Sequence, residues 1–165
     1  MRTSIIRTGL AAALVAVAAT ASLSACSVQV DDKAVPEGKV VVEIDGKKTT
    51  YDDGHAITGT GKAISVGVNK STATVACSGA EQLTLVGTDG AITVSGTCGD
   101  VSATGASQKV VLKDAKELSV LGADNTITAG ALDALKVTGA GNKITYVSSD
   151  SEPELLGANN DVTKK

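Results

Sequence analysis

The sequence has almost no aromatic side chains: it contains no tryptophan, no phenylalanine and only two tyrosines, Tyr51 and Tyr146. Large rings normally fill much of the core of a globular domain. A core built from valine, isoleucine, leucine and alanine must therefore be thin. The 18 glycines and only two prolines, together with abundant threonine and serine, argue against a helical bundle.

Positive charge is scarce outside the first few residues. Arg2 and Arg7 are the only arginines, so residues 26–165 carry 13 lysines against 18 acidic residues, a net charge near −5. Proteins that are steered to nucleic acid or to anionic lipid surfaces present basic patches. We therefore expect no nucleic-acid partner and no electrostatic binding to membranes.

The N-terminal segment has the layout of an export signal. Arg2 and Arg7 precede a charge-free run of 17 mostly small apolar residues, 9–25, which is short for a membrane span. The run ends in Leu23-Ser24-Ala25-Cys26, which resembles the lipobox of bacterial lipoproteins. In that motif the cysteine thiol is acylated, with palmitate for example, and the preceding peptide is removed. The alternative is an ordinary secretory signal cut after an alanine.

These observations predict three parts of the chain. Residues 1–25 are a lipoprotein signal peptide, and residues 26–39 are the lipidated Cys26 followed by a polar tether. Residues 40–165 form the folded domain. The expected location is the outer face of the cell membrane, with the membrane itself as the partner of Cys26.

The two remaining cysteines, Cys77 and Cys98, fit an oxidising compartment, where the simplest expectation is one structural disulfide. The alternative is a zinc site, which would be a more specific function for these cysteines. Zinc requires four ligands, and two thiols with the single histidine of the chain do not supply them. We therefore predict no metal site.

An internal repeat decides the expected fold class. Its leading glycines are spaced by 18, 17, 17 and 18 residues, and each repeat contains two apolar-polar-apolar triplets separated by turns. The period of two within each triplet indicates strands. The glycines are Gly87, Gly105, Gly122, Gly139 and Gly157. The prediction is an all-β, short parallel β-solenoid with about 17–18 residues and two strands per coil; the alternative is an antiparallel β-meander.

Stacked coils would place equivalent residues in columns. One inward column is expected on the first strand of each coil and a facing column on the second. Asparagines at one corner would form a hydrogen-bonded ladder, with a break where Gly90 and Gln108 replace asparagine. The columns are Ile92, Val110, Ile127, Ile144 and Val162, and Leu83, Val101, Leu118 and Leu135; the ladder is Asn125, Asn142 and Asn160.

The repeat fades toward the N-terminus. Residues 40–44 and 47–51, joined by Asp45-Gly46, predict a β-hairpin with a type I′ turn. The hairpin is expected to cap the solenoid, whose end would otherwise present unpaired strand edges.

The lipobox, the Val-x-Cys77-x-Gly and Gly-Thr-Cys98 units, and the GxxNxI/VT repeats together suggest a family. Residues 57–165 resemble an actinobacterial lipoprotein family built on a domain of unknown function. The resemblance implies a small β-solenoid in the cell envelope. It implies no reaction and no cofactor.

Candidate chemistry is sparse. The only histidine, His55, follows Asp52, Asp53 and Gly54. Asp52, Asp53 and His55 are the best candidates in the chain for a site with a general base. Calcium-binding repeats place aspartate in every turn, whereas Asp89, Asp124 and Asp161 are scattered. We therefore expect no catalytic residue and no cofactor. The leading hypothesis is a non-enzymatic structural or recognition module of the envelope; the alternative is an enzyme or carrier acting on an envelope glycan or lipid.

Overall fold

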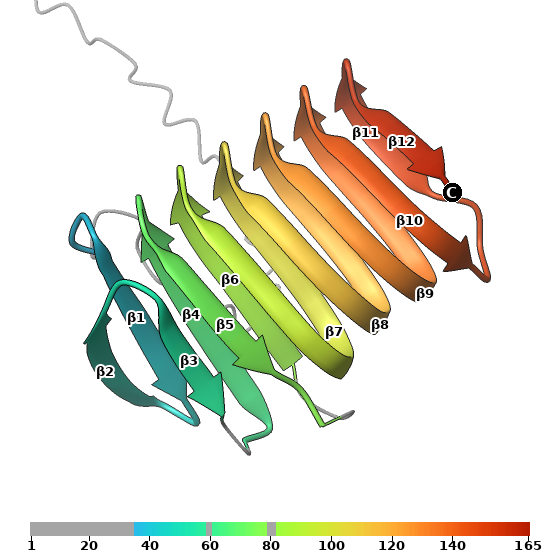
Figure 1. Cartoon of the computed structure of the whole chain (residues 1–165). Helices are drawn as coiled ribbons and strands as arrows, with labels where there is room; N and C mark the ends of the chain where they lie inside the picture. The colour runs from blue at the N-terminus through green and yellow to red at the C-terminus, as the bar shows by residue number, and fades with distance from the viewer. Residues whose placement is uncertain (1–34, 59–60, 79–81) are drawn as a thin grey trace, which may run out of the picture.

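The computed structural model describes residues 35–58, 61–78 and 82–165. These residues form β-strands joined by turns (Figure 1). The predicted signal peptide, the tether up to residue 34 and the lipidation site Cys26 lie outside the described residues. The strands are β1 (Lys39–Ile44), β2 (Lys47–Asp52), β3 (His55–Thr58), β4 (Ala63–Asn69), β5 (Thr72–Ala76), β6 (Gln82–Thr88), β7 (Ala91–Ala106), β8 (Lys109–Ala123), β9 (Thr126–Ala140), β10 (Lys143–Ser149), β11 (Glu154–Ala158) and β12 (Asp161–Lys164).

The strands from β3 onward pair in parallel with the strands one coil away, which makes the fold a β-solenoid of about six turns. The register follows the sequence repeat: Ile127 pairs with Val110 on one side and with Ile144 on the other. The predicted fold class is therefore confirmed. The antiparallel meander is wrong, because antiparallel pairing is confined to β1 with β2 and β4 among the described strands.

The two strands expected in each coil are two arms of one bent strand. β7, β8 and β9 each contain 15 or 16 residues and continue round one corner of the coil, as Figure 1 shows. At that corner the register between β7 and β8 shifts between Val94 and Thr97. The opposite corner is a tight turn between successive strands, where Ser107 and Asp124 adopt positive φ values of 53° and 56°.

Apolar side chains fill the space between the two arms in columns. The predicted column through Ile92, Val110, Ile127 and Ile144 is buried, and Val162 at its end is partly buried. The facing column through Leu83, Val101, Leu118 and Leu135 is buried as well. A further column, Cys98, Ala115 and Leu132, lies next to the bent corner and was not predicted.

The N-terminal hairpin closes one end of the solenoid. β1 and β2 are joined by Asp45 and Gly46, whose φ values of 47° and 84° are both positive, as a type I′ turn requires. β1 pairs antiparallel with β4, and its inward residues Val40 and Val42 join the main core. The predicted hairpin and its capping position are thus present.

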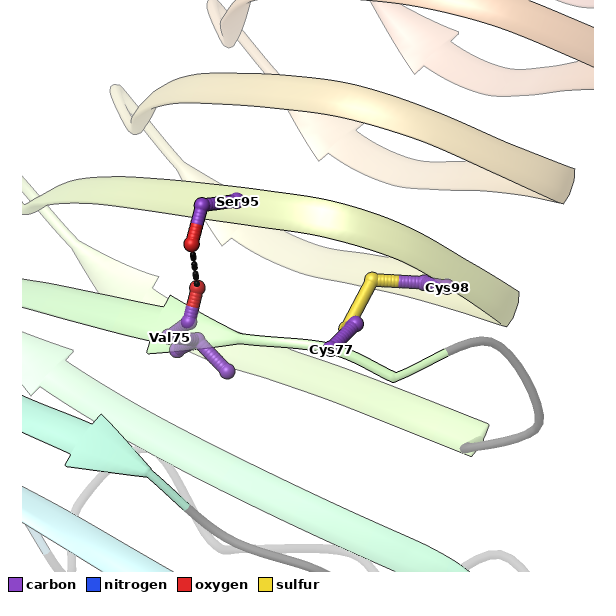
Figure 2. The surroundings of a disulfide bond; sticks show 4 residues. All are labelled: Val75, Cys77, Ser95 and Cys98. Carbon is purple, nitrogen blue, oxygen red and sulfur yellow. Dashed lines mark hydrogen bonds between the residues drawn. A yellow bond between two sulfur atoms is a disulfide. The ribbon is translucent and has the colours of Figure 1, made fainter.

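The predicted disulfide between Cys77 and Cys98 is present, with 5.1 Å between the two Cα atoms (Figure 2). Cys77 follows β5, and Cys98 is a fully buried residue of β7. Ser95 Oγ donates a hydrogen bond of 3.3 Å to the carbonyl oxygen of Val75, and the Cys77 amide donates to Ser95. The bridge therefore connects neighbouring coils at the less regular end of the repeat.

Replacing both Cys77 and Cys98 with alanine is expected to lower the free energy of unfolding by about 2–4 kcal/mol, because the bridge closes a loop that the unfolded chain would otherwise leave free. Urea denaturation of the oxidised protein and of the double variant measures the difference. Non-reducing peptide mass mapping provides the control, since it detects the link in the parent protein. An unchanged urea midpoint would contradict the stabilising role.

Candidate functional site

The predicted residues Asp52, Asp53 and His55 lie together in an open groove of about 560 Å³ at the hairpin end of the solenoid. The end of β2 and the start of β3 form most of its wall, and a tight turn at Asp53 and Gly54 joins them. β1 contributes one residue, Lys39, to the wall. The lining residues are Lys39, Thr50, Tyr51, Asp52, Asp53, Gly54, His55 and Ala56.

The rings of Tyr51 and His55 stack on one another, with centroids 3.6 Å apart and an angle of 9° between their planes. Both residues are only partly buried. The stack covers one face of each ring and holds the end of β2 against the start of β3. The histidine, which sequence analysis considered as a base, is thus a packing partner of a tyrosine.

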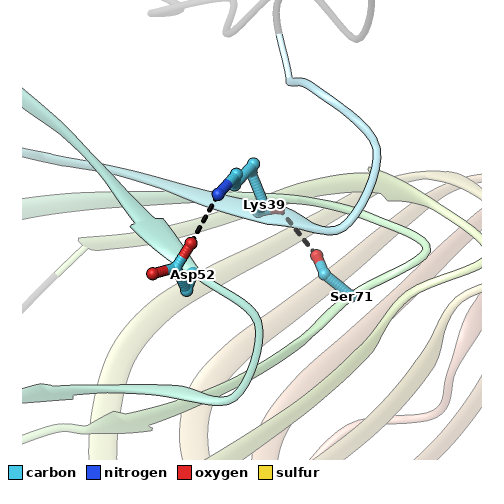
Figure 3. A network of polar contacts seen from close by, with 3 residues as sticks. All are labelled: Lys39, Asp52 and Ser71. Atoms are coloured by element: carbon cyan, nitrogen blue, oxygen red, sulfur yellow. Dashed lines mark hydrogen bonds and ion pairs between the residues drawn. The ribbon is translucent and has the colours of Figure 1, made fainter.

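Asp52 forms an ion pair with Lys39 across the hairpin (Figure 3). The Lys39 ammonium donates a hydrogen bond to this carboxylate, and the pair lowers the pKa of Asp52. The carbonyl oxygen of the same lysine accepts a 2.7 Å hydrogen bond from Ser71 Oγ. The ion pair joins the two strands of the hairpin, and the Ser71 bond fastens the hairpin to the turn between β4 and β5.

Asp53 fastens the same region to β5. One of its carboxylate oxygens accepts hydrogen bonds from the backbone amide of Thr72, at 2.6 Å, and from the Thr72 hydroxyl, at 2.9 Å. These bonds to the charged form lower the pKa of Asp53. Asp53 thus anchors the end of the hairpin to β5, whereas Asp52 joins the two strands of the hairpin to each other.

Lys39 and Tyr51 also line the groove, and neither was predicted to do so. The register of the hairpin places Lys39 opposite Asp52, and this register follows from the two-residue turn at Asp45 and Gly46. Because the turn at Asp45 and Gly46 can be predicted from the sequence, the position of Lys39 opposite Asp52 could have been predicted as well. The stacking of Tyr51 on His55 across a second turn has no comparable sequence signal.

Asn125, Asn142 and Asn160 lie in one row at the tight-turn corner. The Oδ1 atom of Asn142 accepts hydrogen bonds from the backbone amide and from the Nδ2 atom of Asn125, at 3.2 and 3.0 Å. Asn160 receives the same two bonds from Asn142. Each Nδ2 also donates to the carbonyl oxygen of a glycine in the preceding coil. The row stabilises the corner, and it offers no free reactive group.

The break expected in this row at both Gly90 and Gln108 occurs only at Gly90. The Gln108 amide N–H donates to Asn125 Oδ1 at 3.0 Å, and its Nε2 donates to the carbonyl oxygen of Gly87 at 2.8 Å. The longer glutamine side chain thus takes the place of asparagine. Its buried Oε1 has no hydrogen-bond partner among the described residues, and Gly90 in the preceding coil has no side-chain amide to donate.

The outward face of the first arm carries a row of threonines, Thr74, Thr93, Thr128, Thr145 and Thr163, in register across the coils. Val111, which is 41% exposed, interrupts the row. A small hollow of about 260 Å³ on the second arm is lined by Asp100, Ser102 and Glu117, among others. Glu117 forms a 3.0 Å ion pair with Lys136, and its hydrogen bond raises the pKa of that lysine.

Within residues 35–58, 61–78 and 82–165, no group of three or more histidine, cysteine, aspartate or glutamate side chains is placed to hold a metal ion. The same part of the chain contains no helix long and apolar enough to cross a membrane.

Residues 86–133 match DUF3060, a protein family of unknown function. The matched segment contains β7 and β8 and parts of β6 and β9, where the repeat is most regular. No curated protein and no solved structure matches the chain. The comparison agrees with an uncharacterised, repeat-containing domain.

Proposed function

We propose that this chain is a lipid-anchored protein of the cell envelope. Its β-solenoid serves there as a non-enzymatic structural or recognition module on the outer face of the membrane. The proposal includes the resemblance of the chain to an actinobacterial lipoprotein family.

The main observation that supports this proposal is the pairing of the cysteines. The chain has three cysteines, and Cys77 and Cys98 are bonded to each other. The third, Cys26, follows the small residues Ser24 and Ala25 at the end of an export-like segment. A structural disulfide fits an exported protein. In an exported protein, a remaining cysteine that stands in a lipobox is the expected site of acylation.

The geometry of the described coils supports recognition or a structural role better than turnover. The space between the arms is filled with aliphatic side chains, so a substrate would have to bind on the surface. In the surface groove, Asp52 and Asp53 bond to Lys39 and Thr72, and His55 stacks on Tyr51. None of these contacts pairs a nucleophile with a histidine base, which is one common arrangement for nucleophilic catalysis.

Replacing Cys26 with alanine is expected to move the protein from the membrane pellet to the soluble fraction, because the acyl chains are the proposed attachment. Fractionation followed by immunoblotting measures the shift. Intact mass measurement of the parent N-terminal peptide, which should begin at Cys26, counts the acyl chains. Ser27→Ala is the matched control and should remain in the pellet. A Cys26→Ala protein that stays in the membrane although residues 1–25 have been removed, as intact mass measurement would show, would overturn the proposal.

One observation favours a second candidate function. The groove beside Tyr51 and His55 is large enough for a sugar ring, with a volume of about 560 Å³, and it combines aromatic and polar groups. An enzyme or carrier acting on an envelope glycan or lipid would use Asp52, Asp53 and His55 there. Titration with envelope glycan fragments, monitored by the NMR signals of Tyr51 and His55, distinguishes the two functions.

A further inference from the structure

The outward sides of the two arms present different side chains. On the first arm, the outward row consists of threonines and Val111. On the second arm, which carries Leu118 and Leu135 on its inward side, the corresponding row is aliphatic at every other coil. Its exposed leucines, Leu121 and Leu156, are 49% and 69% exposed. We call it the leucine row, and it contains Val86, Thr104, Leu121, Thr138 and Leu156 in register.

A second uncharged row lies beside the leucine row, on the side of the tight turns. We call it the alanine row, and it contains Thr88, Ala106, Ala123, Ala140 and Ala158 in register. Because alanine side chains are short, Leu121 and Leu156 stand out from this part of the surface. The two rows together form an uncharged strip along the second arm. Exposed apolar surface of this kind marks sites of contact with a protein, a ligand or a membrane.

The chain enters the domain on the same side of the second arm. Asn69 continues the alanine row at the hairpin end, and its Nδ2 atom donates a 3.1 Å hydrogen bond to the carbonyl oxygen of Val35. The leucine row continues there through Gly67 to Val41. Val35, Val41 and Val86 are 2%, 1% and 7% exposed, although none of them belongs to the main core. This side of the solenoid thus buries apolar side chains where the chain enters.

We propose that the leucine row and the alanine row lie against the phospholipid surface in the anchored protein. Leu121 and Leu156 enter the boundary between headgroups and acyl chains, which is where peripheral proteins bury their apolar faces. The axis of the solenoid then runs parallel to the bilayer. This inference rests on the proposed lipid anchor at Cys26.

The position of the proposed anchor favours a lipid surface as the partner of this strip. Val35 follows Cys26 by nine residues, which span at most about 30 Å when fully extended. Because the chain enters on the outward side of the second arm, the anchor reaches the bilayer most directly when that side faces the lipid. Attachment also keeps the strip at a high effective concentration of lipid, so that a contact made by few side chains is sufficient.

The hairpin end is the alternative contact surface, because it is also close to the point of entry. An upright solenoid would meet the bilayer there through β2, whose exposed residues include Lys47, Lys48 and Thr49. The flat orientation buries leucines instead. The charged row beside the strip does not oppose it, since Lys136 in that row forms a 3.0 Å ion pair with Glu117.

Quenching of tryptophan fluorescence by brominated lipids tests the orientation, because the chain has no tryptophan of its own. The acylated protein carrying Leu156→Trp or Leu121→Trp is reconstituted into vesicles of phosphatidylcholine and phosphatidylglycerol with ordinary or brominated acyl chains. Each variant is expected to lose about half of its fluorescence in the brominated vesicles, because apolar faces bury about 5–10 Å into the boundary. Circular dichroism checks the fold, which should tolerate a ring at these exposed positions.

Thr128→Trp is the matched control, because Thr128 is exposed on the outward side of the first arm. Thr49→Trp reports on the hairpin end. Both are expected to keep their fluorescence in brominated vesicles. Quenching of Thr49→Trp alone would show an upright protein and overturn the inference, as would equal quenching of the Leu156 and Thr128 variants.

Intact mass measurement of the reconstituted samples separates this inference from the proposal on which it rests. An acylated protein in which no variant is quenched would refute the flat orientation and leave the lipid anchor in place. A mature protein without acyl chains on Cys26 would refute the anchor, and this inference with it.

Discussion

Replacing Ile127 with aspartate is expected to unfold the regular coils as a unit. Ile127 is 1% exposed and lies between Val110 and Ile144 in the column that runs along the first arm. A carboxylate there would be buried among aliphatic side chains without a partner, at a cost of about 4 kcal/mol or more. Because each coil buries its apolar side only against its neighbours, loss of the middle coil removes support from both directions. Urea denaturation followed by far-ultraviolet circular dichroism measures the effect.

Thr128→Asp is the matched control for this change. Thr128 is the next residue along β9, it is exposed, and its neighbours in the outward row are Val111 and Thr145. The same substitution there should change the free energy of unfolding by about 0.5 kcal/mol or less. If Thr128→Asp unfolded the protein and Ile127→Asp did not, the inward and outward sides of the strand would be assigned the wrong way round.

The architecture could be predicted because the repeat sets the register. Parallel coils pair equivalent residues, so a spacing of 17 or 18 residues between leading glycines becomes the pairing of Gly105 with Gly122 and of Gly122 with Gly139. The period of two within each triplet then assigns Ile127 inward and Thr128 outward. These two patterns are enough to place most of the core without any knowledge of the turns.

The bent corner could not be predicted in the same way. The chain changes direction there, and the alternation between inward and outward residues is interrupted, as the register shift between Val94 and Thr97 shows. Cys98, Ala115 and Leu132 are buried next to this corner although they stand outside the apolar-polar-apolar triplets. A pattern with a period of two has no means of finding residues beyond such an interruption.

The candidate site was predicted only in part, because its contacts join separate elements. Asp52, Asp53 and His55 are close in sequence, and the structure brings them to one groove. What each side chain does there depends on partners that local sequence does not reveal: Thr72 for Asp53, and Tyr51 for His55. Both contacts hold the hairpin end of the solenoid in place.

The leading glycine of each repeat lets neighbouring coils approach closely, a role that was not predicted from the sequence. Gly105, Gly122 and Gly139 stack in register, and at each of them the backbone of the preceding coil comes very close. A Cβ atom on Gly122 would lie 1.8 Å from the carbonyl oxygen of Gly105, which is backbone and cannot rotate away. The φ value of Gly122, +139°, is also one that residues with a side chain rarely adopt. The repeat therefore requires glycine for the close approach of the coils.

Gly122→Ala is accordingly expected to lower the free energy of unfolding by about 3–5 kcal/mol, which is a large effect for one methyl group. Gly46→Ala separates the two causes, because Gly46 has a positive φ of +84° but no atom within 4 Å of the added Cβ. That control should cost only about 1–2 kcal/mol, the strain of the backbone conformation alone. Urea denaturation of both variants measures the difference. Equal losses would mean that backbone strain, and not the contact with Gly105, accounts for glycine at this position.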